Sequence, residues 1–268
     1  MLLPRILTAV IGIPIIIWIV HVGSLAYASF VLTVIGLSLY EYSILMQFAA
    51  KPVQRTVLFL FGMLIPATAV INNFTIEQIH RNNLLSLSIT LCVVFSVVWE
   101  LFSGKKSLER IGLTLTGIFL ISWNLIHLMG IRNFPGGEGI TFMMLFTVWT
   151  MDTAAYAAGR AFGKRQLSAV SPKKTWEGAA AGFIAAICMS LLLRIFMKDI
   201  LTLTQALIIG VIIGLAGQVS DLAESMIKRA AGVKDSSNLL PGHGGILDRF
   251  DSYIFLAPLI YYFVLFTA

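Results

Sequence analysis

The segment TQALIIGVIIGLAGQVSDLAESMIKR, residues 204–229, begins as an unbroken apolar run and ends in charged residues. An apolar run that continues for about 20 residues is long enough to cross the hydrocarbon core of a bilayer as a helix. Its carboxylates, Asp221 and Glu224, would then lie in or at the edge of the membrane, where an ionised group is costly and by default indicates function. The segment therefore predicts a transmembrane helix that carries part of a functional site.

The composition of the whole chain indicates a membrane protein. Of its 268 residues, 58% are hydrophobic and only 12% are charged, and the mean hydropathy is +0.89. A soluble protein would need a polar surface that these residues cannot supply, whereas a bilayer accepts apolar side chains around every helix. The two cysteines, Cys92 and Cys188, lie too far apart for a CxxC metal motif and are interpreted as small core residues. We expect an all-α, polytopic integral membrane protein.

Apolar stretches long enough to span a bilayer recur along the chain. We place nine of them, near residues 5–22, 25–48, 55–72, 83–102, 108–130, 139–158, 177–197, 204–229 and 249–267. The first is not expected to be a cleavable signal peptide, because Pro14 lies inside it and no A-x-A-like cleavage site follows. The stretches divide the chain into residues 1–75 with helices 1–3, residues 76–135 with helices 4 and 5 as a candidate dimerisation region, and residues 136–268 with the catalytic helices 6–9.

Glycines one turn apart predict where these helices pack closely. The pairs are Gly178 with Gly182 and Gly210 with Gly214. Small residues at this spacing allow two helix backbones to approach each other. We assign these glycines to packing and not to chemistry.

Lysine and arginine are distributed unevenly between the two ends of the predicted helices. The amino terminus and the loops after the second, fourth, sixth and eighth stretches hold fifteen, and the other loops hold only four, Arg81, Arg132, Arg194 and Lys198. Under the positive-inside rule, the amino terminus and the basic loops face the cytoplasm. The net charge of +6 can there attract anionic headgroups and soluble phosphates. We expect a multi-pass protein of the inner (cytoplasmic) cell membrane with its active site on the cytoplasmic side.

The loop GRAFGKRQLSAVSPKKTWEG, residues 159–178, is the most densely basic. Ser171 followed by Pro172 predicts a helix start, with the hydroxyl as the cap and the proline at the first helical position. Lys173 and Lys174 would then project from the amino-terminal end of the seventh helix, where free N–H groups and the helix dipole favour an anion. The loop predicts a phosphate-binding site.

Charged residues inside the predicted helices extend this site. Asp152 lies near the cytoplasmic end of the sixth helix. Asp221 and Glu224 share one face of the eighth at a spacing of i, i+3, and Ser225 and Lys228 continue that face.

Two other carboxylates, Glu41 and Glu100, lie near the cytoplasmic ends of the second and fourth helices. Snorkelling, or pairing with a nearby lysine or arginine, explains them. We therefore leave both out of the predicted site.

The segment KRAAGVKDSSNLLPGHGGILDRFD, residues 228–251, concentrates charge just before the chain re-enters the membrane. Asp248 and Asp251 lie one turn apart if the last helix begins near residue 247, and they would face Asp221 across the loop. Such an oxygen-rich pocket suits Mg²⁺ better than zinc, because thiolate is absent and histidine is scarce. The glycines around His243 allow backbone N–H groups to turn inward as an anion-binding nest.

Each of these features has a structural explanation when taken alone. His243 between glycines is as often a structural or exposed histidine as a functional one, and Asp248 beside Arg249 is commonly a local ion pair at a helix start. Their convergence at one membrane interface is what indicates chemistry. Carboxylates that hold Mg²⁺ beside cations that hold phosphate oxygens are typical of phosphoryl and nucleotidyl transfer.

Three stretches carry a resemblance to a known family. Residues 225–251, SMIKRAAGVKDSSNLLPGHGGILDRFD, resemble the signature of the phosphatidate cytidylyltransferases, or CDP-diacylglycerol synthases, without a departure. Residues 171–178, SPKKTWEG, and 152–160, DTAAYAAGR, extend the match upstream. The resemblance implies that CTP and phosphatidic acid react to give CDP-diacylglycerol and pyrophosphate, with Mg²⁺ and an assisting potassium ion. It also implies a homodimer among membrane lipids, and we expect no nucleic-acid partner.

Roles follow from this chemistry as hypotheses. The lipid phosphomonoester has a second pKa of about 6 and is already largely dianionic at neutral pH, so the reaction needs no general base. We expect Asp221, Asp248 and Asp251 to hold metal ions that bridge the CTP phosphates. Ser225 and His243 would donate hydrogen bonds to phosphate oxygens, and His243 could protonate the departing pyrophosphate. The cations expected to bind the triphosphate or the lipid phosphate are Lys173, Lys174, Lys228, Arg229, Lys234 and Arg249.

Asp152 is a further candidate, either for the metal pocket or as the partner of a basic residue. Because the lipid stays in the bilayer, the pocket should open both sideways to the cytoplasmic leaflet and to the cytosol.

Two other functions compete with this interpretation. A secondary transporter or channel also contains intramembrane carboxylates and glycine-interrupted helices. It would show two halves with matched broken helices, and this sequence has no such repeat. A CTP-dependent kinase of a lipid alcohol would need a base, and it would release CDP instead of pyrophosphate.

Overall fold

The computed structural model describes residues 3–74, 78–240, 242 and 244–267. Within them the secondary-structure elements are all helices apart from one short antiparallel pair of strands, which confirms the predicted all-α class. The elements are α1 (Leu3–Val22), α2 (Ser24–Phe48), α3 (Arg55–Phe74), α4 (Gln78–Leu101), α5 (Leu108–Gly117), η1 (Ile118–Trp123), α6 (Asn124–Asn133), α7 (Gly137–Phe162), β1 (Gln166–Ser168), β2 (Ser171–Thr175), α8 (Trp176–Arg194), η2 (Ile195–Met197), α9 (Leu203–Ile212), η3 (Ile213–Gly217), α10 (Gln218–Ala230) and α11 (Leu247–Thr267).

Each predicted apolar stretch falls on one continuous run of helix, because α5, η1 and α6 join end to end, as do α8 with η2 and α9 with η3 and α10. Among the described residues, six helices are long and apolar enough to cross a membrane. These are Ser24–Phe48, Leu84–Leu101, Leu108–Asn133, Trp176–Met197, Leu203–Ala230 and Leu247–Thr267. The protein is therefore a membrane protein, while the count of nine spans stays a prediction.

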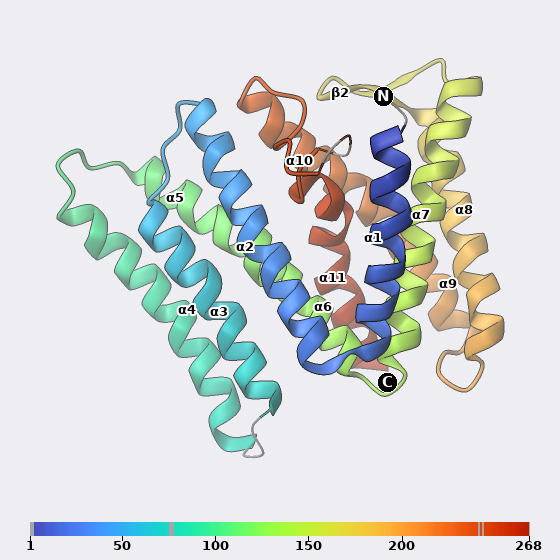
Figure 1. The fold of residues 1–268 in the computed structure, drawn as a ribbon, viewed down its shortest axis with the longest axis horizontal. Coiled ribbons are helices and arrows are strands. Elements are labelled where there is room, and N and C mark those ends of the chain that lie inside the picture. The colour runs from blue at the N-terminus through green and yellow to red at the C-terminus, as the bar shows by residue number, and fades with distance from the viewer. Residues whose placement is uncertain (1–2, 75–77, 241, 243, 268) are drawn as a thin grey trace.

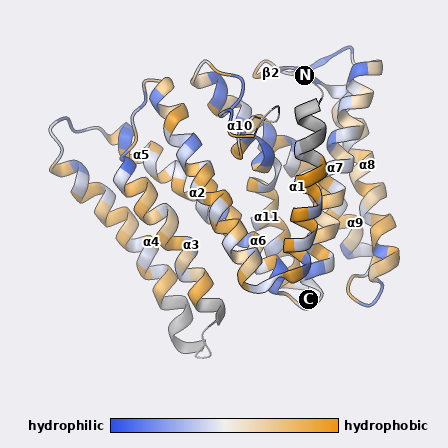
Figure 2. Cartoon of the chain, in the orientation of Figure 1, coloured by the Kyte–Doolittle hydropathy of each residue, from blue (hydrophilic) through white to orange (hydrophobic). Residues whose placement is uncertain are grey.

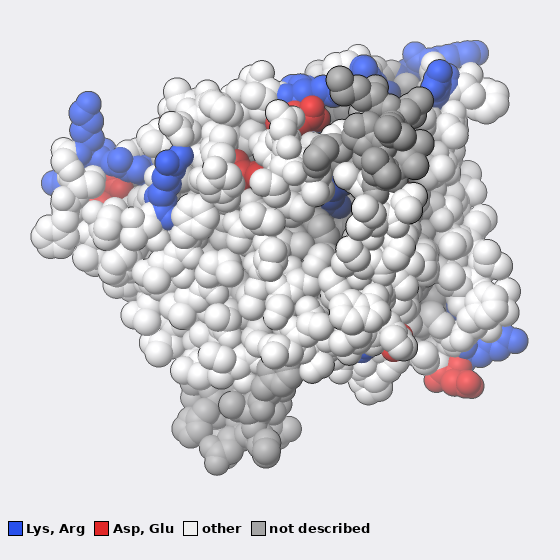
Figure 3. All heavy atoms as spheres, viewed as in Figure 1, with Lys and Arg blue, Asp and Glu red and all other residues white. Residues whose placement is uncertain are grey.

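The helices run up and down, so that alternate connections lie at the same end of the bundle (Figure 1). The connections α2–α3, α4–α5, α7–α8 and α10–α11 lie at the upper end in that view, which we call the basic end. Lysine and arginine gather along this edge of the visible face, with a smaller group at the lower right (Figure 3). The charge asymmetry in the sequence is thus an asymmetry between the two ends of the bundle. That the basic end faces the cytoplasm stays a prediction.

Glycines bring α7, α8 and α9 together, as the sequence predicts. A Cβ atom at Gly178 would lie 2.6 Å from the carbonyl oxygen of Ala155 in α7. One at Gly210 would lie 2.8 Å from the Cα atom of Ile187 in α8. Since no larger side chain fits at either contact, the packing role of these glycines is confirmed.

The outer helices present apolar faces that their own bundle does not cover. In α4 and in α8, only 22% of the most apolar 18-residue stretch is buried. Hydrophobic residues run along the helices, while hydrophilic residues gather in α10 and in the connections (Figure 2).

The two cysteines lie in different surroundings. Cys92 is buried, as predicted. Cys188 is exposed on α8, so its interpretation as a core residue was wrong; the apolar surroundings that suggested a core suit a lipid-facing surface equally well.

Candidate active site

The chain changes from apolar in α9 to polar in α10, which carries part of the site. The π-helical turn η3 separates α10 from α9, and such turns shift the faces on which the following side chains lie and are frequent at functional sites. Gly217, at the end of this turn, packs closely against Met151. A Cβ atom at Gly217 would lie 3.1 Å from the Cε atom of Met151. In α10 the polar residues Glu224, Ser225 and Lys228 are buried.

Three carboxylates converge between α10 and α11. One oxygen each from Asp221, Glu224 and Asp251 lies within 4.8 Å of the others, and we call these residues the acidic cluster. Glu224 is the most enclosed, with 1% of its surface exposed. Lys174 of β2 forms an ion pair with Asp221, and the Nζ atom of Lys228 lies 2.5 Å from Oε2 of Glu224. Cations from two different elements thus counter the repulsion within the cluster.

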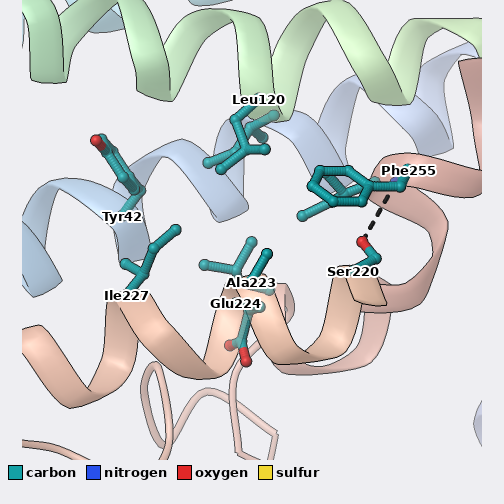
Figure 4. A pocket seen from close by; sticks show the side chains of 10 residues that line it. Tyr42, Leu120, Ser220, Ala223, Glu224, Ile227 and Phe255 are labelled. Carbon is teal, nitrogen blue, oxygen red and sulfur yellow. Dashed lines mark hydrogen bonds between the residues drawn. The ribbon is translucent and has the colours of Figure 1, made fainter. Parts of the chain in front are cut away.

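Ser220 joins α10 to α11 at this point. Its hydroxyl donates to the backbone carbonyl of Asp251 and accepts from the backbone N–H of Phe255 at 3.2 Å (Figure 4). Those two groups stand four residues apart in α11, the spacing of one helical hydrogen bond. By contacting both of them, the serine hydroxyl ties the backbone of Asp251 to α10.

A small pocket lies on the other side of α10, between α2, η1 and α11. Leu120, Ala223 and Phe255 point toward one another across it, and the carboxylate of Glu224 points away from them (Figure 4). Most of the residues that line this pocket are apolar. It is therefore a mainly apolar gap in the packing beside the acidic cluster.

Asp248 lies in the first turn of α11 and contacts the loop before it. Its Oδ1 atom accepts from Lys228 Nζ at 2.6 Å. Its Oδ2 atom accepts from the backbone N–H groups of Ser236 and Gly245 at 2.8 and 2.7 Å. Because Lys228 also contacts Glu224, it connects Asp248 to the acidic cluster.

Comparisons with known proteins match this chain over almost its full length. Residues 3–267 match the family model described as the cytidylyltransferase family. The chain is 33% identical over 284 residues to the phosphatidate cytidylyltransferase of Synechocystis sp., covering 97% of this chain and 95% of that protein. It is 29% identical over 262 residues to the phosphatidate cytidylyltransferase of Bacillus subtilis, covering 96% of each. The chain belongs to the cytidylyltransferase family.

The acidic cluster and its two lysines bring together residues from β2, α10 and α11. Asp221 and Asp251 are brought together, as expected, and Glu224 joins them. Both oxygens of Asp248 already have partners within the protein, so its assignment as a metal ligand stays a prediction. Ser225 lies beside Asp221, with its hydroxyl 3.4 Å from Oδ1.

The structure corrects the predicted helix start at Ser171. Residues Ser171–Thr175 form strand β2, which pairs antiparallel with β1, and α8 begins at Trp176 with Thr175 as its cap, accepting from the backbone N–H of Gly178 at 3.2 Å. A proline backbone suits an extended strand as well as a first helical turn, so the Ser-Pro pair did not distinguish the two. Lys174 does not lie at a helix start but reaches Asp221 from the strand.

The other predicted residues lie around this core. Arg229 donates to the carbonyl oxygen of Val170 at 3.3 Å and so holds the β1–β2 turn against α10. Asp152 in α7 interacts electrostatically with Asp221, Lys174 and Arg249, which agrees with either role considered for it. Lys173, Lys234 and Arg249 are exposed, and His243 lies outside the described residues. Their substrate contacts stay predictions.

Of the two carboxylates set aside, one pairs as expected and the other does not. Glu100 forms an ion pair with Arg110, with 2.6 Å between Oε1 and Nη2. Glu41 is 1% exposed, so it does not snorkel, and no ion pair among the described residues includes it. It instead contacts the loop that precedes α11. The sequence did contain a signal for Glu41: it is a carboxylate in an otherwise apolar helix, and such a residue by default indicates function.

Proposed function

We propose that this cytidylyltransferase transfers CMP from CTP to phosphatidic acid and produces CDP-diacylglycerol and pyrophosphate. Its similarity to proteins named phosphatidate cytidylyltransferase, over almost the full length of both chains, supports this substrate pair. The observation that carries the proposal is the acidic cluster of Asp221, Glu224 and Asp251. Lys174 of β2 and Lys228 of α10 form ion pairs with it. This arrangement suits the meeting of a membrane-bound phosphate with a soluble triphosphate.

The acidic cluster fits a hard divalent cation. Its donors are all carboxylate oxygens, which Mg²⁺ prefers, and Oε1 of Glu224 is buried without a hydrogen-bond partner among the described residues. We propose that Asp221, Glu224 and Asp251 hold Mg²⁺, with Asp248 as a further candidate and K⁺ as a candidate second ion. When bound, Mg²⁺ neutralises phosphate charge and helps to align the reacting groups.

The protein's own residues would mainly position and neutralise the reactants. An oxygen of the lipid phosphate forms a bond to the α-phosphorus of CTP, and the bond from that phosphorus to the bridging oxygen of pyrophosphate breaks. Lys174 and Lys228 stand beside the cluster and would contact phosphate oxygens as negative charges approach each other. Fixed cations that need no reorganisation stabilise such a transition state more than water does.

The location of the site supports access from two phases. The acidic residues lie on α10 and in the first turns of α11, the helices joined by a connection at the basic end (Figure 1), and the apolar residues of α9 and α11 continue away from it (Figure 2). Tyr156 and Trp176, near that end of α7 and α8, are 68% and 60% exposed, and such aromatic residues favour the membrane interface. We propose that the basic end faces the cytoplasm, that the lipid stays in the adjoining leaflet of the inner membrane, and that the protein acts as a homodimer.

The products of the reaction test this function directly. The purified protein in detergent is supplied with phosphatidic acid, Mg²⁺ and CTP labelled in its cytidine. We expect a labelled lipid and one pyrophosphate for each lipid formed, and we expect Asp221→Asn and Asp248→Asn to remove most of both. Release of CDP from a lipid alcohol, with no pyrophosphate, would instead identify a CTP-dependent lipid kinase.

A further inference from the structure

Glu41 of α2 lies against the loop that precedes α11, although the two are far apart in the sequence. Its Oε1 atom accepts from the Ser237 hydroxyl at 2.6 Å and from the Ile246 N–H at 2.9 Å. Its Oε2 atom accepts from the Leu247 N–H at 2.7 Å and lies 2.9 Å from the Ser236 hydroxyl. With 1% of its surface exposed, this carboxylate is satisfied by a single segment of the chain.

The contacts with Ile246 and Leu247 make Glu41 a cap for α11. Leu247 is the first residue of α11, and the first N–H groups of a helix have no partner within it. The positive end of the helix dipole also favours a carboxylate there. Glu41 therefore stabilises the start of α11 from a different helix, in a place where the segment before α11 offers glycines instead of a local capping side chain.

The glycines of the loop leave room for this contact and for nothing larger. A Cβ atom at Gly245 would lie 2.5 Å from both oxygens of Glu41. One at Gly244, where φ is +80°, would lie 2.7 Å from Oδ2 of Asp248. The loop is therefore closed around two carboxylates, Glu41 on one side and Asp248 on the other, with the Ser236 hydroxyl within hydrogen-bond distance of both.

The turn that Glu41 contacts carries the acidic side chains of α11. Asp248 is in the first turn of α11 and Asp251 is one turn further on, so a shift or rotation of that turn moves Asp251 relative to Asp221 and Glu224. Helix α2 can resist such a shift, because the neighbouring Tyr42 is buried and its hydroxyl donates to the Leu113 carbonyl in α5 at 2.8 Å.

We propose that Glu41 is a positioning residue for cytidylyl transfer: it fixes the first turn of α11 against α2, so that Asp251 meets the carboxylates of α10 in a divalent-cation site. The proposal rests on the proposed function for its reaction, but its effect on cation binding can be measured separately. It also gives the amino-terminal helices, which carry none of the sequence motifs, a part in the site.

The central variant is Glu41→Gln, which keeps the size of the side chain. A glutamine presents an NH₂ group where one carboxylate oxygen accepts, so it cannot satisfy the same set of donors. Groups that orient metal ligands from the next layer typically change metal affinity or activity by about 10- to 100-fold when they are removed. We expect Glu41→Gln to raise the Mg²⁺ concentration for half-maximal activity, and for half-maximal thermal stabilisation without substrates, by a factor in this range.

Glu100→Gln is the matched control, because Glu100 is also a buried carboxylate with several hydrogen bonds, but it lies in α4 and pairs with Arg110 of α5. We expect it to lower the melting temperature while leaving the Mg²⁺ concentration dependence of that temperature unchanged. Glu41→Asp, which keeps the charge, and Ser237→Ala, which removes one donor, should both show smaller Mg²⁺ effects than Glu41→Gln. If Glu41→Gln cannot be purified folded, these two milder variants provide the test.

Two results would overturn the proposal. The first is a Glu41→Gln protein that is less stable but has the wild-type Mg²⁺ response, as in the control. The second is a wild-type Mg²⁺ response in both milder variants. A wild-type protein that forms no cytidine-bearing lipid would refute the proposed function instead, and the Mg²⁺-dependent melting of wild type and variants would still decide the role of Glu41.

Discussion

Removal of the Lys228 ammonium is expected to destabilise the protein strongly. Its Nζ atom lies 2.5 Å from Oε2 of Glu224 and 2.6 Å from Oδ1 of Asp248. The three side chains are only 11%, 1% and 4% exposed, so water cannot replace the lost cation. Loss of one partner from a buried ion pair costs about 3–5 kcal/mol, because the remaining charge is left unpaired.

Thermal unfolding of Lys228→Met in detergent without divalent cations measures this effect. For a chain of this size, a change of 1 kcal/mol moves the melting temperature by about 2–4 °C, so we expect a fall of roughly 6–20 °C. Addition of Glu224→Gln to the same protein should recover part of the loss, since it removes one of the unpaired charges and the two sites are directly coupled.

Lys234→Met is the control for this experiment, because Lys234 is an exposed lysine of the same region. Its effect on the free energy of unfolding should stay within about 0.5 kcal/mol, as for most surface substitutions. A Lys228→Met protein that melts within 2 °C of this control, or a double variant less stable than Lys228→Met, would show that the lysine does not neutralise the buried carboxylates.

Three further predictions concern the elements around the site. Lys174→Gln removes the cation beside Asp221 and should lower kcat by about 10²- to 10³-fold, the usual effect of losing one fixed donor to transition-state charge; unchanged steady-state rates would contradict this. Thr175→Ala removes the cap of α8 and should cost about 1 kcal/mol in thermal or denaturant unfolding, whereas a neutral effect would exclude a capping role. Gly178→Leu places a side chain against the Ala155 carbonyl and should separate α7 from α8, seen as a large drop in melting temperature; a wild-type melting temperature would show that this contact can relax.

Composition and local pattern were enough to predict the helical membrane fold. The length of an apolar run predicts a helix that can span a bilayer, and helical spacing places Asp248 and Asp251 near the start of the last helix. These features depend on neighbours in sequence. The approach of Asp221 to Asp251 was expected for another reason, because a single loop joins the two helices that carry them.

Features that depend on distant parts of the chain escaped sequence reasoning. The partners of Glu41 lie about two hundred positions away, so nothing near it in the sequence reveals the contact. Strand β2 exists because β1 pairs with it, and its own Ser-Pro start is equally compatible with a helix. Cys188 lies in an apolar stretch whether that face meets protein or lipid, and only the packed bundle distinguishes the two.

Binding of Mn²⁺, a paramagnetic substitute for Mg²⁺, tests whether the acidic cluster holds the catalytic cation. The titration follows the loss of the free-ion electron paramagnetic resonance signal for the purified wild type and for Asp251→Asn. We expect a saturable site in the wild type, with affinity lower by about 10-fold or more in Asp251→Asn, and a parallel loss of pyrophosphate release. Equal Mn²⁺ affinity in the two proteins would show that the acidic cluster does not hold the cation.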